Sequence, residues 1–311
     1  MTAAARVLLS LLACSAAIFI PSTSTGYGSS GEKTGELIAF MGTDVNGGRG
    51  RLYTIRDDGS GLGRLTTTSF WVNQSQPAWS PDGRWIVFSG SASVSGDDYD
   101  LWLVRVDGSG LRRLTRIPGT PQDPDWSPDG RTIVFANSPS GDGANLDIYA
   151  VGDDGRGLRR LTRNPAQDAD PDWSPDGRKI AFASDRLGNF HVHVMNPDGT
   201  RQRLLIRARS GEPDWSLDGR WIAYASARDG DPDIYVAKAD GSGEHALTRN
   251  RAEDWPPSWA PDSRRIAFAS SRGGCPGGCL MEIYVMNADG SKQRQVTRFP
   301  RGFAHYPAWR P

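Results

Sequence analysis

Short apolar runs recur along the whole chain, and each run is bounded by Gly, Pro, Asp or Ser. One run of every repeat ends in a Trp, and these residues lie 42 to 50 positions apart: Trp79, Trp126, Trp173, Trp215, Trp259 and Trp309. A period in this range is typical of solenoids and propellers. Four apolar runs return in the same order within each repeat, which predicts four short strands per repeat.

Two recurrent turn motifs predict how these strands are connected. Ser-Pro-Asp-Gly separates the first run from the second at Ser80–Gly83, Ser127–Gly130 and Ser174–Gly177, with Leu217 in place of Pro in the next repeat. In this motif Pro presets φ, Asp bonds to its own backbone and Gly tolerates the exit geometry. Asp-Gly follows every third run, and Asp-Gly between apolar runs is a strong hairpin signal. The strands of a repeat are therefore predicted to be antiparallel.

The second run of each repeat, such as Ile180–Phe182, places bulky side chains on one face and Ala or Val on the other. Because both faces are apolar, the strand must be covered on both sides, as in sheets that stack face to face. Four antiparallel strands repeated radially form a propeller blade.

Counting the runs predicts an all-β, six-bladed β-propeller that spans residues 36–311. The chain begins with a second strand, Leu37–Phe40, and ends with a first strand, His305–Arg310. We expect the C-terminal strand to pair with the N-terminal blade and close the ring, which removes exposed sheet edges. A β-solenoid of the same period is the alternative, but a solenoid needs caps rather than a split repeat.

The first 25 residues have the pattern of a signal peptide, and residues 26–35 form a short linker. Arg6 precedes an apolar run, Val7–Ile20, which is shorter than a membrane span and is followed by small polar residues. We therefore expect an exported monomeric propeller, periplasmic or extracellular, with no transmembrane segment in the mature chain. The alternatives are an uncleaved anchor and lipidation at Cys14, although the apolar Ala16–Ile20 argues against lipidation.

The chain has a formal net charge of zero and no basic stripe, which excludes the electrostatic signature of a nucleic-acid-binding protein. No Gly-x-Ser-x-Gly, His-Glu-x-x-His or phosphate-binding Gly-Lys motif is present. The chain contains only four His, so few residues could serve as the base of a nucleophilic triad.

The repeated pattern DPDWSPDGRKIAFAS, IYVMNADG and Leu-Thr closely resembles the repeats of TolB-type propellers, over nearly all of the chain after the expected signal. The resemblance implies a channel mouth that is presented to a protein partner and that holds a cation. TolB itself looks like an α/β N-terminal domain followed by the propeller, whereas here only the short linker of residues 26–35 separates the expected signal from the first blade.

Acidic side chains recur three residues and one residue before the Trp in three consecutive repeats: Asp123, Asp125, Asp170, Asp172, Glu212 and Asp214. First strands line the channel of a propeller, so we expect these carboxylates at the channel mouth together with His305 and Tyr306. Converging carboxylates attract Ca²⁺, for which Asp125, Asp172 and Asp214 are the candidate ligands, or basic groups of a partner. The same Asp residues also fit a structural role, bonding backbone at the strand start.

Three weaker features complete the candidate chemistry. Cys275 and Cys279 lie in one loop and are expected to form a disulfide in an exported protein. His191 and His193 lie on one strand face, where they fit a metal pair or ordinary packing. The last feature is an Arg that follows the second strand and fits an acidic ligand or a nearby Asp: Arg186, Arg228 and Arg272.

The function predicted from these features is a non-catalytic, protein-binding or scaffold module of the cell envelope. Its working surface is expected at the loop-rich end, where long loops join second to third strands and blade to blade. No cofactor is required, and Ca²⁺ in the channel is optional. The alternative is a metal-dependent lyase or hydrolase acting on an envelope polysaccharide or peptide, which needs His191, His193 or His305 to converge at the channel.

Overall fold

The computed structural model describes residues 35–43, 50–66, 73–93, 98–141, 145–273, 281–299 and 302–311. Within these ranges no helix is both long enough and apolar enough to cross a membrane. The predicted signal peptide with Cys14, the linker up to residue 34 and the predicted Cys275–Cys279 disulfide lie outside the described residues.

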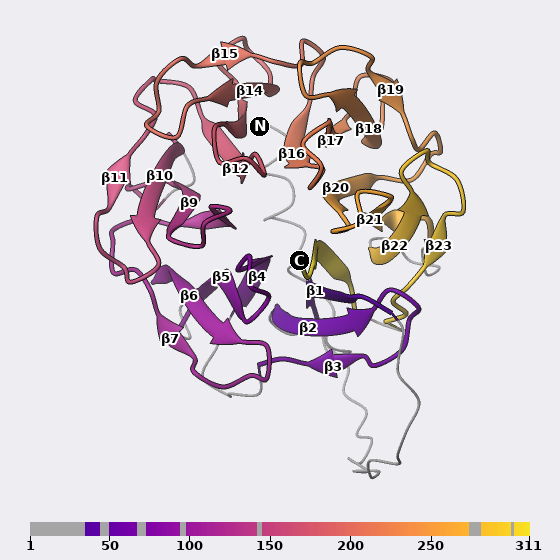
Figure 1. The fold of residues 1–311 in the computed structure, drawn as a ribbon, viewed down its shortest axis with the longest axis horizontal. Coiled ribbons are helices and arrows are strands. Elements are labelled where there is room, and N and C mark those ends of the chain that lie inside the picture. The colour runs from indigo at the N-terminus through magenta and orange to yellow at the C-terminus, as the bar shows by residue number, and fades with distance from the viewer. Residues whose placement is uncertain are drawn as a thin grey trace.

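The described chain forms six four-stranded antiparallel sheets arranged as blades around a central axis (Figure 1). Blade 1 is β24 (Ala304–Trp309), β1 (Leu37–Gly42), β2 (Arg51–Arg56) and β3 (Gly63–Arg64). Blade 2 is β4 (Asn73–Trp79), β5 (Trp85–Ser91), β6 (Tyr99–Arg105) and β7 (Arg112–Arg113). Blade 3 is β8 (Gln122–Trp126), β9 (Thr132–Asn137), β10 (Asp147–Gly152) and β11 (Arg159–Arg160).

The other three blades repeat this order along the chain. Blade 4 is β12 (Asp168–Trp173), β13 (Ile180–Ser184), β14 (His191–Met195) and β15 (Arg203–Leu204). Blade 5 is β16 (Gly211–Trp215), β17 (Trp221–Ser226), β18 (Asp233–Lys238) and β19 (His245–Ala246). Blade 6 is β20 (Asp254–Trp259), β21 (Arg265–Ser270), β22 (Glu282–Asn287) and β23 (Arg294–Gln295), with a short 3₁₀ turn, Ser271–Gly273, after β21.

The predicted ring closure is confirmed, because the C-terminal strand β24 pairs antiparallel with β1 and aligns Trp309 with Ile38. Charged side chains reinforce the junction between blades 1 and 6. Arg265 forms ion pairs with Glu36 at 2.9 Å and with Asp57 at 2.6 Å, and its guanidinium also lies over the Trp309 ring. The first and last strands of the chain thus share one sheet, which leaves no open blade edge at the junction.

The core lies between successive blades, as the two-sided apolar second strands predict. Ile86 and Phe88 of β5 are fully buried and cluster with Ala39 and Leu52 of blade 1. Phe40 of blade 1 packs in the same way with residues of blade 6. Burial on both faces of the second strand therefore joins each sheet to its neighbours.

The Ser-Pro-Asp-Gly turns form as their chemistry predicts. In the first copy the Ser80 hydroxyl donates to Asp82 at 2.6 Å, Asp82 accepts the Arg84 N–H, and Gly83 has a φ of +64°. These turns and the Asp-Gly turns lie together at one end of the propeller, the hairpin end. The opposite, loop-rich end carries the blade-to-blade loops.

The fourth strands are short, and each covers two residues, as β7 does. Just beyond β7, the Thr115 hydroxyl accepts the Leu101 N–H at 2.9 Å and donates to Asp100 at 2.8 Å. The Leu114 and Thr115 N–H groups also donate to the Leu101 carbonyl, at 2.8 and 3.3 Å. A side-chain bond thus adds to the backbone bonds that hold the end of the fourth strand against the third.

Candidate functional site

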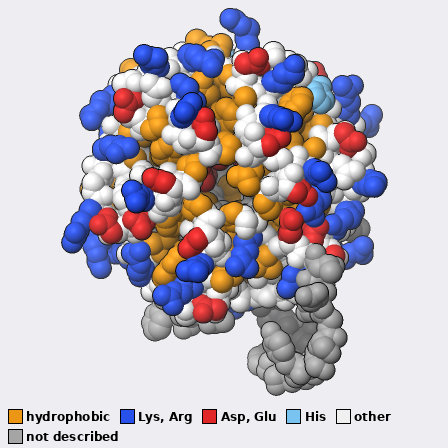
Figure 2. All heavy atoms as spheres, in the orientation of Figure 1, with side chains coloured by type: hydrophobic (Ala, Val, Ile, Leu, Met, Phe, Trp, Pro, Cys, Tyr) orange, Lys and Arg blue, Asp and Glu red, His pale blue; other side chains and the backbone are white. Residues whose placement is uncertain are grey.

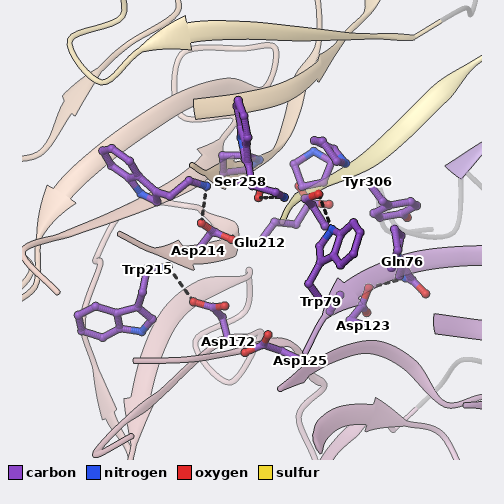
Figure 3. A pocket seen from close by; sticks show the side chains of 18 of the residues that line it. Gln76, Trp79, Asp123, Asp125, Asp172, Glu212, Asp214, Trp215, Ser258 and Tyr306 are labelled. Atoms are coloured by element: carbon purple, nitrogen blue, oxygen red, sulfur yellow. Dashed lines mark hydrogen bonds between the residues drawn. The ribbon is translucent and has the colours of Figure 1, made fainter. Parts of the chain in front are cut away.

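The first strands surround a central cavity of about 260 Å³ to which all six blades contribute (Figure 3). All six predicted carboxylates and Tyr306 line this cavity. His305 does not line it. The structure thus brings together seven of the eight side chains expected at the channel.

A β-bulge, rather than simple alternation along a regular strand, sets the direction of these side chains. In blade 3, Asp125 pairs with Val134 and Gln122 with Ala136, so one extra residue is inserted in the first strand. The residue three positions before the Trp has a left-handed φ of 50° to 53° in five blades. We call these five residues the floor ring: Gln76, Asp123, Asp170, Glu212 and Tyr306. Non-glycine residues rarely adopt this conformation, and they concentrate at functional or tightly packed sites.

In blades 3 to 5 the residue one position before the Trp connects the blade to the next one. Asp125 accepts the backbone N–H of Trp173, Asp172 that of Trp215, and Asp214 that of Trp259, each at 2.7 Å. We call these three the linking aspartates. The backbone-bonding role left open by the sequence is therefore confirmed for them, with the bond made across the blade interface rather than within the strand.

The neutral side of the channel has weaker links of the same kind. Ser258 stands at the linking position of blade 6 and accepts the Trp309 N–H at 3.5 Å, and Ala78 and Ala308 stand there in blades 2 and 1. Carboxylates therefore occupy only the half of the channel formed by blades 3 to 5, as predicted.

Hydrogen bonds also join members of the floor ring. Gln76 donates its amide to Asp123, and the Glu212 backbone N–H donates to Asp170 at 3.2 Å. Glu212 Oε2 is buried and has no hydrogen-bond partner among the described residues. A buried polar atom without a partner costs free energy, so a donor that reached Glu212 Oε2 would relieve that cost.

Burial raises the pKa of every carboxyl in the floor ring. The pKa of Asp123 is raised well above its ordinary value, first by burial and then by the charge of Asp170. The pKa of Glu212 is raised well above its ordinary value by burial and by the charges of Asp170 and Asp123. Like charges held close together in a poorly solvated site favour protonation of some members.

The linking aspartates show the same effect. Burial raises the pKa of Asp125 to about 7 and that of Asp214 to about 8. The pKa of Asp172, between them, is raised well above its ordinary value by burial and by the charges of both neighbours. Near neutral pH the channel therefore holds part of its carboxyls as neutral acids, and an arriving cation would favour their ionisation.

The cavity extends to the hairpin end. Its lining includes Leu217, Pro261 and Pro311. Each of these residues lies two positions after the Trp of its repeat, and for Leu217 and Pro261 this is the second residue of the turn to the second strand. Figure 2 shows hydrophobic side chains gathered around a central hollow on one face of the molecule. We expected the carboxylates at a mouth on the loop-rich end, and the structure instead sets them inside the channel in a cavity that continues to the hairpins.

The sequence analysis did not identify this apolar border, although its residues recur in every repeat. The second turn residue is Pro or Leu in every repeat. Three of the Pro rings lie close to the Gly of the neighbouring turn, and Pro175 is 3.5 Å from the position that a Cβ would take at Gly219. The turns interlock around the channel, so the residues that shape the hairpins also border the cavity.

The histidines do not converge on the channel. His305 is buried against Tyr306 and Trp255, with ring centroids 4.2 and 5.7 Å apart. His191 contacts the Ala208 carbonyl at 3.1 Å, and His193 is buried beside Phe182. Within the described residues no group of three or more His, Cys, Asp or Glu is placed to hold a metal ion. Calcium at the linking aspartates stays a prediction, and the histidine arrangement required by the lyase alternative is not observed.

The arginines that follow the second strands have partners within their own blades. Arg186 pairs with Asp168 at 2.9 Å, Arg228 with Glu244 at 2.8 Å, and Arg272 with Asp254 at 2.6 Å. Their pairing with nearby acids, one of the two interpretations of the sequence, is therefore confirmed.

Comparison with known proteins agrees with this architecture. Residues 205–311 match the family model of the TolB beta propeller domain. TolB from Acinetobacter baumannii has a similar structure, with 21% identity and a TM-score of 0.75 over 89% of this chain and 67% of that one. A provisionally assigned TolB from Agrobacterium tumefaciens gives 21% identity and a TM-score of 0.67 over 89% and 99%.

More distant propellers are also similar in fold. Oligogalacturonate lyase from Vibrio parahaemolyticus has 15% identity and a TM-score of 0.54 over 76% of this chain and 72% of that one. No curated protein matches the chain. The chain thus has the same fold as TolB-type six-bladed β-propellers, and its last third matches their family model. At these identities the likeness concerns the fold and not the activity.

Proposed function

We propose that this protein is an exported, non-catalytic binding propeller of the cell envelope whose channel receives a basic segment of a protein partner. The observation that carries the proposal is the convergence of six carboxylates from three consecutive blades on one cavity. Glu212 Oε2 adds an acceptor without a partner. An ammonium or guanidinium supplies positive charge, which no side chain of the cavity lining carries, and donates hydrogen bonds to the carboxylates.

The direction of entry follows from the cavity lining. Leu217 is 53% exposed and belongs to a turn that borders the cavity. An apolar border around a polar interior is typical of binding sites, in which buried polar groups give orientation and the surrounding apolar surface excludes water. We therefore propose entry from the hairpin end, and this replaces the loop-rich end as the candidate working face.

The cellular placement is a separate part of the proposal. It is supported by the apolar run Val7–Ile20 after Arg6, which has the pattern of a signal peptide. Fractionation of cells that express the full chain tests it, and recovery in the cytoplasm with an intact N-terminus would contradict export.

The binding role is tested by affinity capture from an envelope extract with wild-type protein and with a variant that carries Asn at all three linking aspartates. Asn keeps an acceptor for the Trp N–H groups but cannot ionise. We expect one or more proteins to be captured by the wild type and lost with the variant. Capture by the wild type should strengthen as the pH rises from about 6 to about 8.5, because the cavity carboxyls ionise there. Equal capture by both proteins would overturn the channel as the binding site.

A further inference from the structure

A second charged feature lies at the loop-rich end, outside the channel. In blades 2 to 6 the fourth strand is followed by a residue that bonds near the start of the third strand, as the Thr162 hydroxyl does with the Ile148 N–H at 2.9 Å. The next residue is Arg in five consecutive blades. We call these five residues the loop-face arginines: Arg116, Arg163, Arg207, Arg249 and Arg298.

Equivalent contacts fix these arginines at the same level of each blade. Hydroxyls accept a backbone N–H near the start of β6, β18 and β22 in the same way, and they belong to Thr115, Thr248 and Thr297. In blade 4 the Ile206 N–H donates to the Val192 carbonyl at 3.0 Å, which preserves the register without a Thr. Because third strands begin at the loop-rich end, the five arginines form a ring on that face.

The loop-face arginines are all exposed, and none of their side chains forms an ion pair or hydrogen bond with the described residues. Arg298 has an acidic neighbour in Glu282, whose pKa is raised by burial while the charge of Arg298 acts to lower it. Other arginines of the same face, such as Arg113 and Arg160, instead pair with buried Asp residues. Five positive charges in one ring thus remain available to an outside partner.

The hairpin end also carries five arginines in the same five blades, but these arginines have acidic neighbours. Each follows an Asp by two residues, and in three blades the two side chains approach to 3.9 or 4.0 Å. We call these the hairpin-face arginines: Arg84, Arg131, Arg178, Arg220 and Arg264. Their charge is locally balanced, whereas that of the loop-face arginines is not.

We infer that the loop-face arginines dock the propeller on a membrane surface rich in anionic phospholipid. Arginines held at one level around an axis can all meet a flat surface at once, whereas a linear polyanion would reach only those on one side of the ring. Guanidinium groups match phosphate oxygens in geometry as well as in charge. With the loop-rich face on the membrane, the channel cavity opens away from it at the hairpin end.

Vesicle co-sedimentation of the full chain tests this inference. Vesicles of phosphatidylcholine with about a third phosphatidylglycerol are compared with pure phosphatidylcholine, at about 50 and about 200 mM salt. We expect preferential binding to the anionic vesicles that weakens with salt. Each Arg→Gln change in the loop-face ring should lower the partition coefficient about five-fold.

The matched control replaces the five hairpin-face arginines by Gln, which changes the net charge by the same amount at the opposite face. This control should retain binding, whereas the variant with five Gln at the loop face should fall to the level of neutral vesicles. Melting temperatures verify that both variants are folded. Equal losses in the two variants, or no preference of the wild type for anionic vesicles, would overturn the inference. Binding to soluble polyphosphate but not to vesicles would also overturn it, in favour of a polymer.

Discussion

Replacement of Asp214 by Asn should make the protein more stable at alkaline pH. Asp214 accepts the Trp259 N–H at 2.7 Å, and burial raises its pKa to about 8. The amide oxygen of Asn can accept the same hydrogen bond at nearly the same place. The substitution therefore removes the ionisable group while it retains the link between blades 5 and 6.

The sign of the effect follows from proton linkage. Between the ordinary pKa of 3.8 and the folded value of about 8, the folded protein keeps a proton that the unfolded chain releases. The stability contributed by protonated Asp214 is complete below the unfolded pKa and is lost as the pH rises through the folded pKa. At about 1.4 kcal/mol per pKa unit, a shift of about four units sets an upper bound of about 6 kcal/mol. Contact with channel water lowers this, so we expect a loss of about 2 to 4 kcal/mol.

Denaturant or thermal unfolding between pH 5 and 9, in the presence of a chelator, measures the effect. The wild type should lose several degrees in melting temperature over this range, at about 2 to 4 °C per kcal/mol. The Asp214→Asn variant should lose less and exceed the wild type above pH 8. Because Asp125 and Asp172 titrate with Asp214, the wild-type curve reports the three linking aspartates as a group.

A suitable control is Asp176→Asn in a Ser-Pro-Asp-Gly turn. Hydrogen bonds from Ser174 and from the Arg178 backbone lower the pKa of Asp176, so it stays ionised throughout the tested range. This control should shift stability equally at pH 6 and pH 9. If Asp214→Asn kept the wild-type pH dependence, or stayed less stable than the wild type at pH 9, the argument from buried channel carboxyls would be refuted.

Three further predictions concern the cation, the closure and the junction between blades 1 and 6. Any calcium-dependent rise in melting temperature should vanish when all three linking aspartates are changed to Asn, and an unchanged rise would retire the cation site. Deletion of residues 305–311 should cost far more stability than deletion of residues 1–34, because it removes a paired strand of blade 1; similar small losses would contradict closure. Arg265→Met should lower the free energy of unfolding by about 1 to 3 kcal/mol because it leaves Asp57 with a weaker pair, while exposed Arg264→Gln should stay within about 0.5 kcal/mol; equal effects in chemical denaturation would discount the junction.

Local chemistry made most of the fold predictable. The Ser-Pro-Asp-Gly and Asp-Gly turns specify hairpins through bonds within a few residues, and the two-sided apolar second strands specify stacked sheets. Ring closure followed from a split repeat, with Leu37–Phe40 and His305–Arg310 as the two parts of one blade. Because turns, strands and repeat all indicate the same fold, the architecture can be predicted from a single sequence.

The geometry of the site depended on contacts that the repeat alone does not reveal. The bulge places Asp123 and Tyr306 in the left-handed region, which a period-two pattern cannot indicate. The bond from the Trp173 N–H to Asp125 crosses a blade interface and joins residues 48 positions apart. Sequence reasoning found the carboxylates, but their connection to the next blade and the extent of the cavity required the assembled ring.

Site-specific photo-crosslinking tests the central claim, that a partner enters the channel from the hairpin end, most directly. A photoreactive residue is placed at Leu217 beside the cavity or at Leu187 near the loop-rich end, since these side chains are comparably exposed at 53% and 58%. We predict a crosslinked protein partner from position 217 that disappears when the three linking aspartates are changed to Asn. A partner crosslinked only from position 187, or one that persists at position 217 without those carboxylates, would contradict the account.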